Sequence, residues 1–147
     1  MDQEIAWESY DDPPFKYRLT ETYTLATSIY PPGLIVTTHV TLHMNGNIVL
    51  REGWQWDGAS SVGIDTPNFM RPSCVHDAFY YLMREGYLPK TYRKQADQLM
   101  YRLCREDGMA WLRAKYCYWA VRLFGWNGLK KRGTANEAAH RMREEDP

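Results

Sequence analysis

Cysteine, long apolar runs and net charge are scarce or missing in this 147-residue sequence. The three cysteines are odd in number and none lies in a CxxC pair, which argues against a disulfide framework and weakens a zinc site. No stretch approaches the roughly 18 apolar residues of a membrane span. The acidic start at residues 1–5 lacks the basic and then apolar pattern of a signal peptide. We therefore expect a reduced protein of the cytoplasm, without a transmembrane segment.

Basic and acidic side chains number 18 each and cancel. A bulk nucleic-acid binder is basic, so nucleic acid is not an expected partner. Aromatic residues, in contrast, are abundant at 14%. Such an excess indicates either an aromatic core or a surface that meets lipid or a protein partner. Trp54 and Trp56 illustrate both possibilities, since each suits a lipid-facing anchor or ordinary packing.

The pattern along the chain predicts an α+β fold in a single domain over residues 1–147, with an N-terminal antiparallel β meander packed on a three-helix unit. Residues 36–44 alternate in polarity, and Asn45-Gly46 after them predicts a hairpin with a type I′ turn. The expected parts are a loose arm at 1–14, a β-rich part at 15–52, a loop at 53–71, a helical part at 72–126 and a polar tail at 127–147.

Three helices are expected in the second half of the chain. Pro72 and Ser73 are typical of a helix start, so the first helix should run from there to about Arg84. The second should run from about residue 91 to 108, and the third from 109 to 124. In the third helix an apolar stripe predicts the face that packs into the core, formed by Leu112, Tyr116, Trp119 and Leu123.

The candidate chemistry lies on the first two helices. His76 and Tyr80 stand one turn apart on a shared helix face, whereas Asp77 is rotated by about 100°. Asp97, on a partly buried face of the second helix, needs a partner. If the two helices pack antiparallel, Asp97 meets His76 and Tyr80 across the seam. It would then keep one imidazole nitrogen in the N–H form and leave the other as a base.

Asp77 should face a different neighbour, and a metal ion near the loop containing Asp57 and Gly58 is the most reasonable one. Carboxylate oxygens and backbone carbonyls are hard ligands, which favour Ca²⁺ over Zn²⁺.

Two other interpretations of the His-Asp pair stay open. His76 can be a core histidine whose ring is satisfied by Asp97, with no role in catalysis. The pair can also belong to a metal phosphohydrolase, in which further histidines on neighbouring elements assist. His39 and His43 are the upstream candidates, although both lie on the polar face of a predicted strand.

The motif His-Asp-x-x-Tyr at residues 76–80, followed by Asp97, resembles the phospholipase A2 superfamily, particularly its small prokaryotic branch. Trp54-x-x-Asp57 and the 21-residue separation between His76 and Asp97 are similar to that branch. The likeness covers about residues 54–126.

This resemblance implies a phospholipase-A2-like antiparallel helix pair and roles for six residues. His76 would activate a water as general base, Asp97 would orient His76, and Tyr80 would hydrogen-bond Asp97. Ca²⁺ would be held by the ligands Asp57, Gly58 (through its carbonyl) and Asp77, and would polarise an ester carbonyl.

The overall layout, a strand-rich start followed by Trp-Asp-Gly-Ala-Ser at residues 56–60 and the His-Asp helix, is also similar to an uncharacterised family of bacterial and phage proteins. Two functions are therefore expected as alternatives. One is calcium-dependent, phospholipase-A2-like hydrolysis of a lipid or small-molecule ester. The other is that of a non-catalytic phage or bacterial accessory protein, which binds a small ligand or a host protein partner through the same pocket. If the protein is phage-encoded, its expected location is the host cytoplasm.

Overall fold

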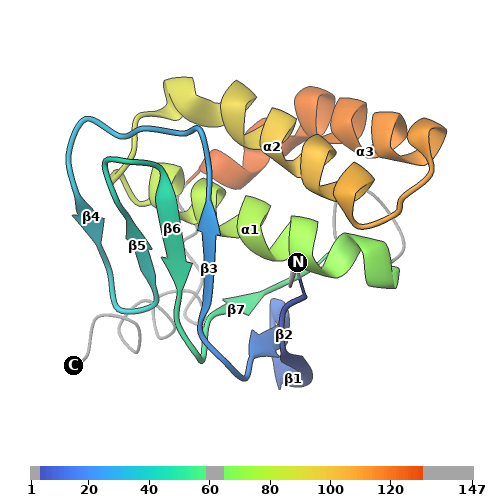
Figure 1. The fold of residues 1–147 in the computed structure, drawn as a ribbon, viewed down its shortest axis with the longest axis horizontal. Helices are drawn as coiled ribbons and strands as arrows, with labels where there is room; N and C mark the ends of the chain where they lie inside the picture. The colour runs from blue at the N-terminus through green and yellow to red at the C-terminus, as the bar shows by residue number, and fades with distance from the viewer. Residues whose placement is uncertain (1–3, 59–64, 131–147) are drawn as a thin grey trace.

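The computed structural model describes residues 4–58 and 65–130. Strands come first and helices follow, which confirms the predicted α+β class (Figure 1). The strands are β1 (Trp7–Asp12), β2 (Phe15–Leu19), β3 (Tyr23–Ala26), β4 (Ile35–Val36), β5 (Val40–Leu42), β6 (Asn47–Leu50) and β7 (Gln55–Trp56). The helices are α1 (Pro67–Arg84), α2 (Arg93–Glu106) and α3 (Trp111–Phe124), with short 3-10 helices η1 (Lys90–Tyr92) and η2 (Gly125–Leu129).

The strands form two antiparallel sheets, in the orders β1-β2-β7 and β3-β6-β5-β4. Helix α1 lies between the strands and α2 in Figure 1, and α3 packs on α2. The larger core cluster joins strand residues such as Val40, Leu42 and Ile48 to α1 residues such as Phe79 and Leu82. Because α1 is packed on two sides, its side chains can meet both the β7 segment and α2.

The N-terminal segment is ordered where the structure describes it, so the prediction of a loose arm over residues 1–14 is wrong. Trp7–Asp12 forms β1, an edge strand in which Trp7 pairs with Leu19 and Glu8 with Arg18. Arg18 Nε donates a hydrogen bond to Glu8 Oε2 at 2.9 Å. Edge strands tolerate polar and charged side chains, and for this reason the composition of the segment resembled that of an arm.

Helix α1 begins five residues earlier than predicted, at Pro67, and contains Pro72 in its interior. An interior proline costs about 3 kcal/mol because it lacks an N–H donor. The extra turn buries Phe69 and Met70, and burial of such side chains is worth about 1.5–3 kcal/mol each. Apolar burial therefore offsets the proline. The predicted loop at 53–71 gives its last residues to α1 and residues 55–56 to β7.

The predicted hairpin is present between β5 and β6, but the turn is not type I′. Gly46 has a φ of +92°, whereas no residue other than glycine has positive φ in the described ranges. The amide of Gly46 donates to the carbonyl of His43 at 2.9 Å, which closes the turn. One left-handed glycine after an ordinary turn gives the same reversal as a type I′ pair.

The predicted core stripe of α3 is instead exposed, and this prediction was wrong. The exposed fractions are 73% for Leu112 and 55% for Trp119, and Tyr116 and Leu123 are similarly open. The buried face of α3 carries the small side chains Ala114, Cys117, Ala120 and Val121, packed against α2 residues Met100 and Cys104. Small side chains let two helices pack closely without voids. The helical periodicity of the apolar residues is present, but the stripe of large side chains faces away from the core.

The end of the helical part differs little from expectation. Within the predicted tail, Asn127–Leu129 completes η2, and residues 131–147 lie outside the described residues. Across residues 4–58 and 65–130, none of the helices has the length and apolarity that a membrane span requires.

Candidate functional site

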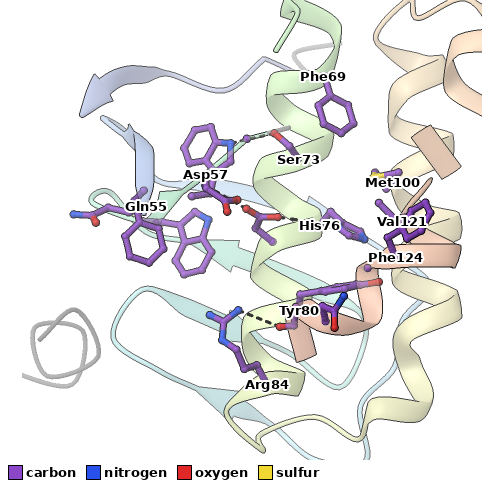
Figure 2. Close-up of a pocket in the computed structure, with 18 residues that line it drawn as sticks. Gln55, Asp57, Phe69, Ser73, His76, Tyr80, Arg84, Met100, Val121 and Phe124 are labelled. Atoms are coloured by element: carbon purple, nitrogen blue, oxygen red, sulfur yellow. Dashed lines mark hydrogen bonds and ion pairs between the residues drawn. The ribbon is translucent and has the colours of Figure 1, made fainter. Parts of the chain in front are cut away.

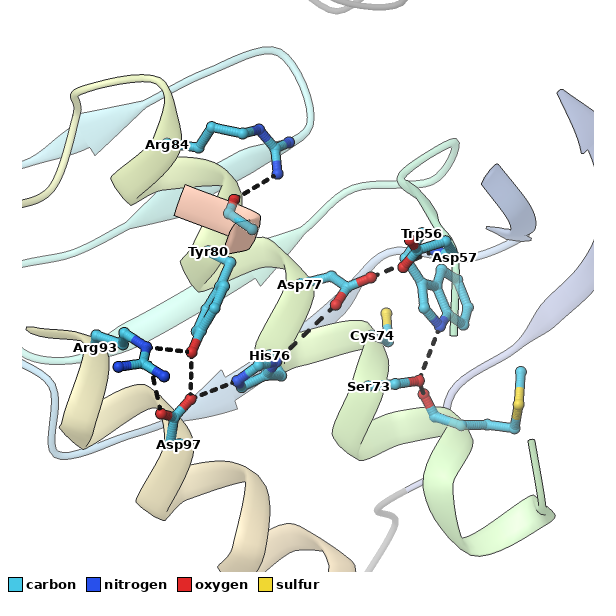
Figure 3. Close-up of polar contacts among 12 residues, drawn as sticks. Trp56, Asp57, Ser73, Cys74, His76, Asp77, Tyr80, Arg84, Arg93 and Asp97 are labelled. Atoms are coloured by element: carbon cyan, nitrogen blue, oxygen red, sulfur yellow. Dashed lines mark hydrogen bonds and ion pairs between the residues drawn. The ribbon is translucent and has the colours of Figure 1, made fainter. Parts of the chain in front are cut away.

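The structure brings His76, Tyr80 and Asp97 together as the sequence predicted. Asp97 Oδ1 lies 2.7 Å from His76 Nε2 and accepts a hydrogen bond from Tyr80 OH, also at 2.7 Å (Figure 3). His76 and Tyr80 come from one face of α1, and Asp97 comes from α2. Asp97 is fully buried, with an exposed fraction of 0%. A buried carboxylate is stable only with such partners.

Two arginines complete the surroundings of Asp97, and sequence reasoning missed both. Arg122 Nη1, at the end of α3, donates to Asp97 Oδ2 at 2.8 Å. Arg93 Nε lies 3.9 Å from the same oxygen and donates to Tyr80 OH at 3.0 Å. The four-residue spacing of Arg93 and Asp97 on α2 was an available signal. Arg122 carried no comparable signal, because its contact depends on how α3 packs.

These contacts determine the protonation of Asp97 and Tyr80. Burial alone would raise the pKa of Asp97, but hydrogen bonds from His76, Tyr80 and Arg122 outweigh it and hold the pKa below its ordinary value. Burial, followed by the charge of Asp97, raises the pKa of Tyr80 well above that of a free phenol. At neutral pH Asp97 is therefore a carboxylate and Tyr80 a hydrogen-bond donor.

The Asp97 carboxylate determines which of the two ring nitrogens of His76 carries a proton. Because a carboxylate only accepts hydrogen bonds, Nε2 of His76 carries a proton toward it. In the neutral imidazole the other nitrogen, Nδ1, then holds a lone pair. Nδ1 lies 4.0 Å from Asp77 Oδ1, beyond hydrogen-bond distance. This arrangement has the form of a base oriented by an acid.

The proposed calcium ligands also lie together. The Asp57 amide donates to Asp77 Oδ2 at 3.3 Å, and both residues line the same pocket as His76. Gly58 has a φ of +71°, and a Cβ there would lie 2.7 Å from Asp65 Oδ1 and from a Tyr17 ring carbon. A glycine is thus required for the backbone to pass this point.

The donor chemistry at Asp57 and Asp77 fits a hard cation such as Ca²⁺, which binds oxygen ligands. In the described parts of the chain no cluster of three or more His, Cys, Asp or Glu residues has a metal-binding arrangement. If Ca²⁺ binds there, the carboxylates of Asp57 and Asp77 would supply negative charge, and carbonyl and water oxygens would complete the usual six to eight ligands.

The pocket beside these residues has a volume of about 290 Å³. One wall is a face of α1, along which Phe69, Ser73, His76, Tyr80 and Arg84 follow one another (Figure 2). Residues of β7 and of η2 form the other walls. His39 and His43 are not among the described residues that line it, so the structure gives no support to the phosphohydrolase interpretation.

Trp54 and Trp56 serve as packing residues that fix the β7 segment on α1. Trp54 Nε1 donates to the carbonyl of Cys74 at 3.3 Å, and Trp56 Nε1 donates to Ser73 Oγ at 3.1 Å. Both rings are buried. They hold the Asp57-Gly58 backbone against the helix that carries His76 and Asp77.

Comparison with known proteins identifies no relative of this chain. No family model matches the chain significantly, and neither does any curated protein or any solved structure. The function must therefore be argued from the site itself.

Proposed function

We propose that the protein hydrolyses an ester, with His76 as the general base and Ca²⁺ at Asp57 and Asp77, in the manner of a phospholipase A2. The observation that carries this proposal is the 2.7 Å contact between His76 Nε2 and Asp97 Oδ1, which leaves Nδ1 on the side of Asp77 and the pocket. An imidazole fixed in this way can accept a proton from a water within hydrogen-bond reach.

The protein's own groups account for the proton movements of hydrolysis. His76 Nδ1 takes a proton from a water, whose oxygen attacks the ester carbonyl carbon. The carbon–oxygen bond to the alcohol then breaks, and the imidazolium returns the proton to the departing alkoxide. Asp97 stabilises the imidazolium in between, and Tyr80 holds Asp97 in place. Ca²⁺, when bound, would polarise the carbonyl and stabilise the developing oxyanion.

Catalysis is tested with His76→Gln, assayed against wild type on dissolved esters in the presence of calcium. We expect about a 1,000-fold loss of kcat, within the range for a general base. His43→Gln is the matched control, because His43 is exposed and lies outside the pocket. Wild-type protein that cleaves no ester in calcium, under conditions where an active phospholipase A2 works, would refute the proposal.

Calcium binding is tested without reference to activity. Isothermal titration calorimetry should show one Ca²⁺ site in the wild type and a loss of affinity of at least tenfold in Asp77→Asn, because the variant removes one of two carboxylates. Asp11→Asn, on the exposed edge of β1, is the control for overall charge. Equal affinity in all three proteins would place the ion elsewhere.

A non-catalytic binding role through the same pocket is the second candidate. One observation favours it: both oxygens of Asp97 have partners and His76 is only 8% exposed, as in a purely structural buried network. In that case His76→Gln would leave ligand or partner binding unchanged, whereas substitution of an exposed pocket-wall residue such as Phe124→Ala would abolish it.

A further inference from the structure

The side of α3 that faces away from α2 carries a contiguous group of large apolar side chains. Its centre is the exposed stripe of Leu112, Tyr116, Trp119 and Leu123, whose spacing places all four on one side of the helix. Trp111 lies at the start of the stripe, and Phe124 and Trp126 lie at its end; these three are also exposed. We call the seven residues the outer α3 face. Single exposed apolar residues are ordinary, but a contiguous group marks a contact surface.

The charges along this face have one sign. From Gly108 to Lys130 the sequence contains four basic residues and no acidic one, although the chain as a whole is neutral. Lys115 Nζ lies 5.9 Å from the ring centroid of Trp111, and Lys130 Nζ lies 4.4 Å from that of Trp126. Both lysines are exposed. Each end of the outer α3 face therefore combines an indole ring with an ammonium group.

This combination matches the interface between a bilayer and water. Tryptophan and tyrosine favour the headgroup region, because the ring is apolar while its N–H or O–H group stays hydrated. A lysine next to them lays its methylene stem along apolar surface and keeps its charge among the headgroups. Helices with an apolar aromatic face and basic flanks bind in the plane of such an interface. The opposite side of α3 packs on α2, so only the outer face is available for this contact.

Other occupants match the face less well. Two copies of it brought together would place Lys115 and Lys130 among like charges, with no carboxylate of the same segment to pair them. Residues 131–147 contain a single large apolar side chain, Met142, and cannot match a stripe of four. Nucleic acid would need rings for base stacking along the whole face, whereas Leu112 and Leu123 provide none. An anionic lipid surface matches both the charge and the apolar side chains.

We propose that the outer α3 face binds the surface of a bilayer that contains anionic lipids, with α3 in the plane of the headgroups and with Lys115 and Lys130 against lipid phosphates. This peripheral contact goes beyond the proposed hydrolysis and does not depend on it, because it requires neither His76 nor Ca²⁺.

The test is sedimentation of the wild-type protein with sucrose-loaded vesicles in EDTA, which removes any attachment through calcium. Vesicles of phosphatidylcholine mixed with phosphatidylserine should bind the protein, and added salt should weaken the binding. Vesicles of phosphatidylcholine alone should bind it at least about tenfold more weakly, because they lack the attraction for the two lysines. Absence of binding to both kinds of vesicle, or equal binding to both, would overturn the inference.

Leu123→Ser tests the apolar part of the contact. Leu123 is 62% exposed, so the fold should tolerate the change, and we expect vesicle binding to fall about tenfold. Leu34→Ser is the matched control, because Leu34 is 58% exposed and directly precedes β4, which lies far from α3 in Figure 1. Its binding should equal that of the wild type. Equal binding by the two variants would show that the outer α3 face does not contact the lipid.

The double variant Lys115→Gln/Lys130→Gln tests the charged part. Binding to the phosphatidylserine vesicles should fall about 25-fold, since each lysine near an anionic surface contributes about fivefold. Lys16→Gln/Lys90→Gln is the control, because it removes the same charge from exposed positions on β2 and η1. An equal loss in both double variants would mean that overall charge attracts the protein, which would contradict a specific lipid-binding face.

The competing occupants give results of their own in the absence of vesicle binding. A dimer in analytical ultracentrifugation that dissociates in Leu123→Ser would assign the face to a second copy of the chain. Binding of single-stranded DNA that is lost in Lys115→Gln/Lys130→Gln would assign it to nucleic acid. Either result would overturn the lipid assignment and leave the proposed hydrolysis intact.

Discussion

Two charged side chains are buried where α1 and α2 meet, Arg71 on α1 and Asp97 on α2. They differ in how fully their partners are paired. Toward the start of α1, Arg71 is 2% exposed and is held by Asp107 through Nη2 at 2.8 Å and Nε at 3.0 Å. Glu106 Oε1 accepts from Nη2 at 3.2 Å, and Tyr23 OH accepts from Nη1 at 2.9 Å. Further along, Asp97 is surrounded by His76, Tyr80 and Arg122.

The two clusters differ in whether the residues around the buried charge keep a polar atom that faces the pocket. The Arg71 cluster joins α1 to the end of α2 and to β3, and its carboxylates and guanidinium are fixed on one another. The Asp97 cluster includes an imidazole whose second nitrogen is turned to the pocket. We propose that the Arg71 cluster serves the fold, whereas the Asp97 cluster, which includes a titratable nitrogen beside the pocket of His76, serves the proposed hydrolysis.

The largest effect should come from Asp97→Asn, which breaks the chemical side of the comparison. The amide cannot hold His76 in the required protonation state, so we expect kcat to fall by about 10³-fold, as in His76→Gln, which removes the base itself. Ester hydrolysis by the folded variant, with circular dichroism as the control for folding, measures this. A loss smaller than tenfold would mean that Asp97 serves the fold alone, as the Arg71 cluster does.

Arg71→Met breaks the structural side. It leaves the Asp107 carboxylate without its guanidinium, and removal of one member of a buried pair lowers the free energy of unfolding by about 3–5 kcal/mol. Urea unfolding measures the loss. The activity of the protein that remains folded should equal that of wild type, because Arg71 does not line the pocket of His76. Comparable losses of activity in Arg71→Met and Asp97→Asn would contradict the division into a structural and a catalytic cluster.

Acid should weaken the Asp97 cluster in a defined direction. The pKa of Asp97 is lower in the folded protein than in the unfolded chain, so its contribution to stability is complete above about pH 4. That contribution is lost as the pH falls through the folded-state value. Urea midpoints measured from pH 7 down to pH 2 should therefore fall less steeply in Asp97→Asn than in wild type. Parallel curves would contradict the assignment.

The smallest effect should come from Tyr80→Phe, which keeps the ring and removes one hydrogen bond from each of Asp97 and Arg93. We expect the free energy of unfolding to fall by about 1 kcal/mol and kcat to fall by less than tenfold. Thermal unfolding and the ester assay report the two values. A loss of activity equal to that of Asp97→Asn would make Tyr80 a direct participant in the reaction.

The two clusters also show which contacts can be predicted from the sequence and which cannot. Helical spacing placed His76 and Tyr80 on one face, and a lone carboxylate among apolar neighbours pointed to Asp97, because both arguments use only local geometry. Arg122 and Arg71 meet their partners through the packing of separate helices, which local pattern does not specify. The stripe of α3 failed for a related reason: periodicity shows that a helix has two faces, but it does not say which one is covered.

Some tryptophans line the pocket and the others lie on the surface, and this difference affects the fluorescence of the protein. Trp54 and Trp56 are buried beside His76, whereas Trp7, Trp111, Trp119 and Trp126 are exposed. Iodide in the buffer should quench the four exposed indoles and leave a blue-shifted emission from the two buried ones. Measured in iodide, the intrinsic fluorescence of the unlabelled protein becomes a direct signal of pocket occupancy.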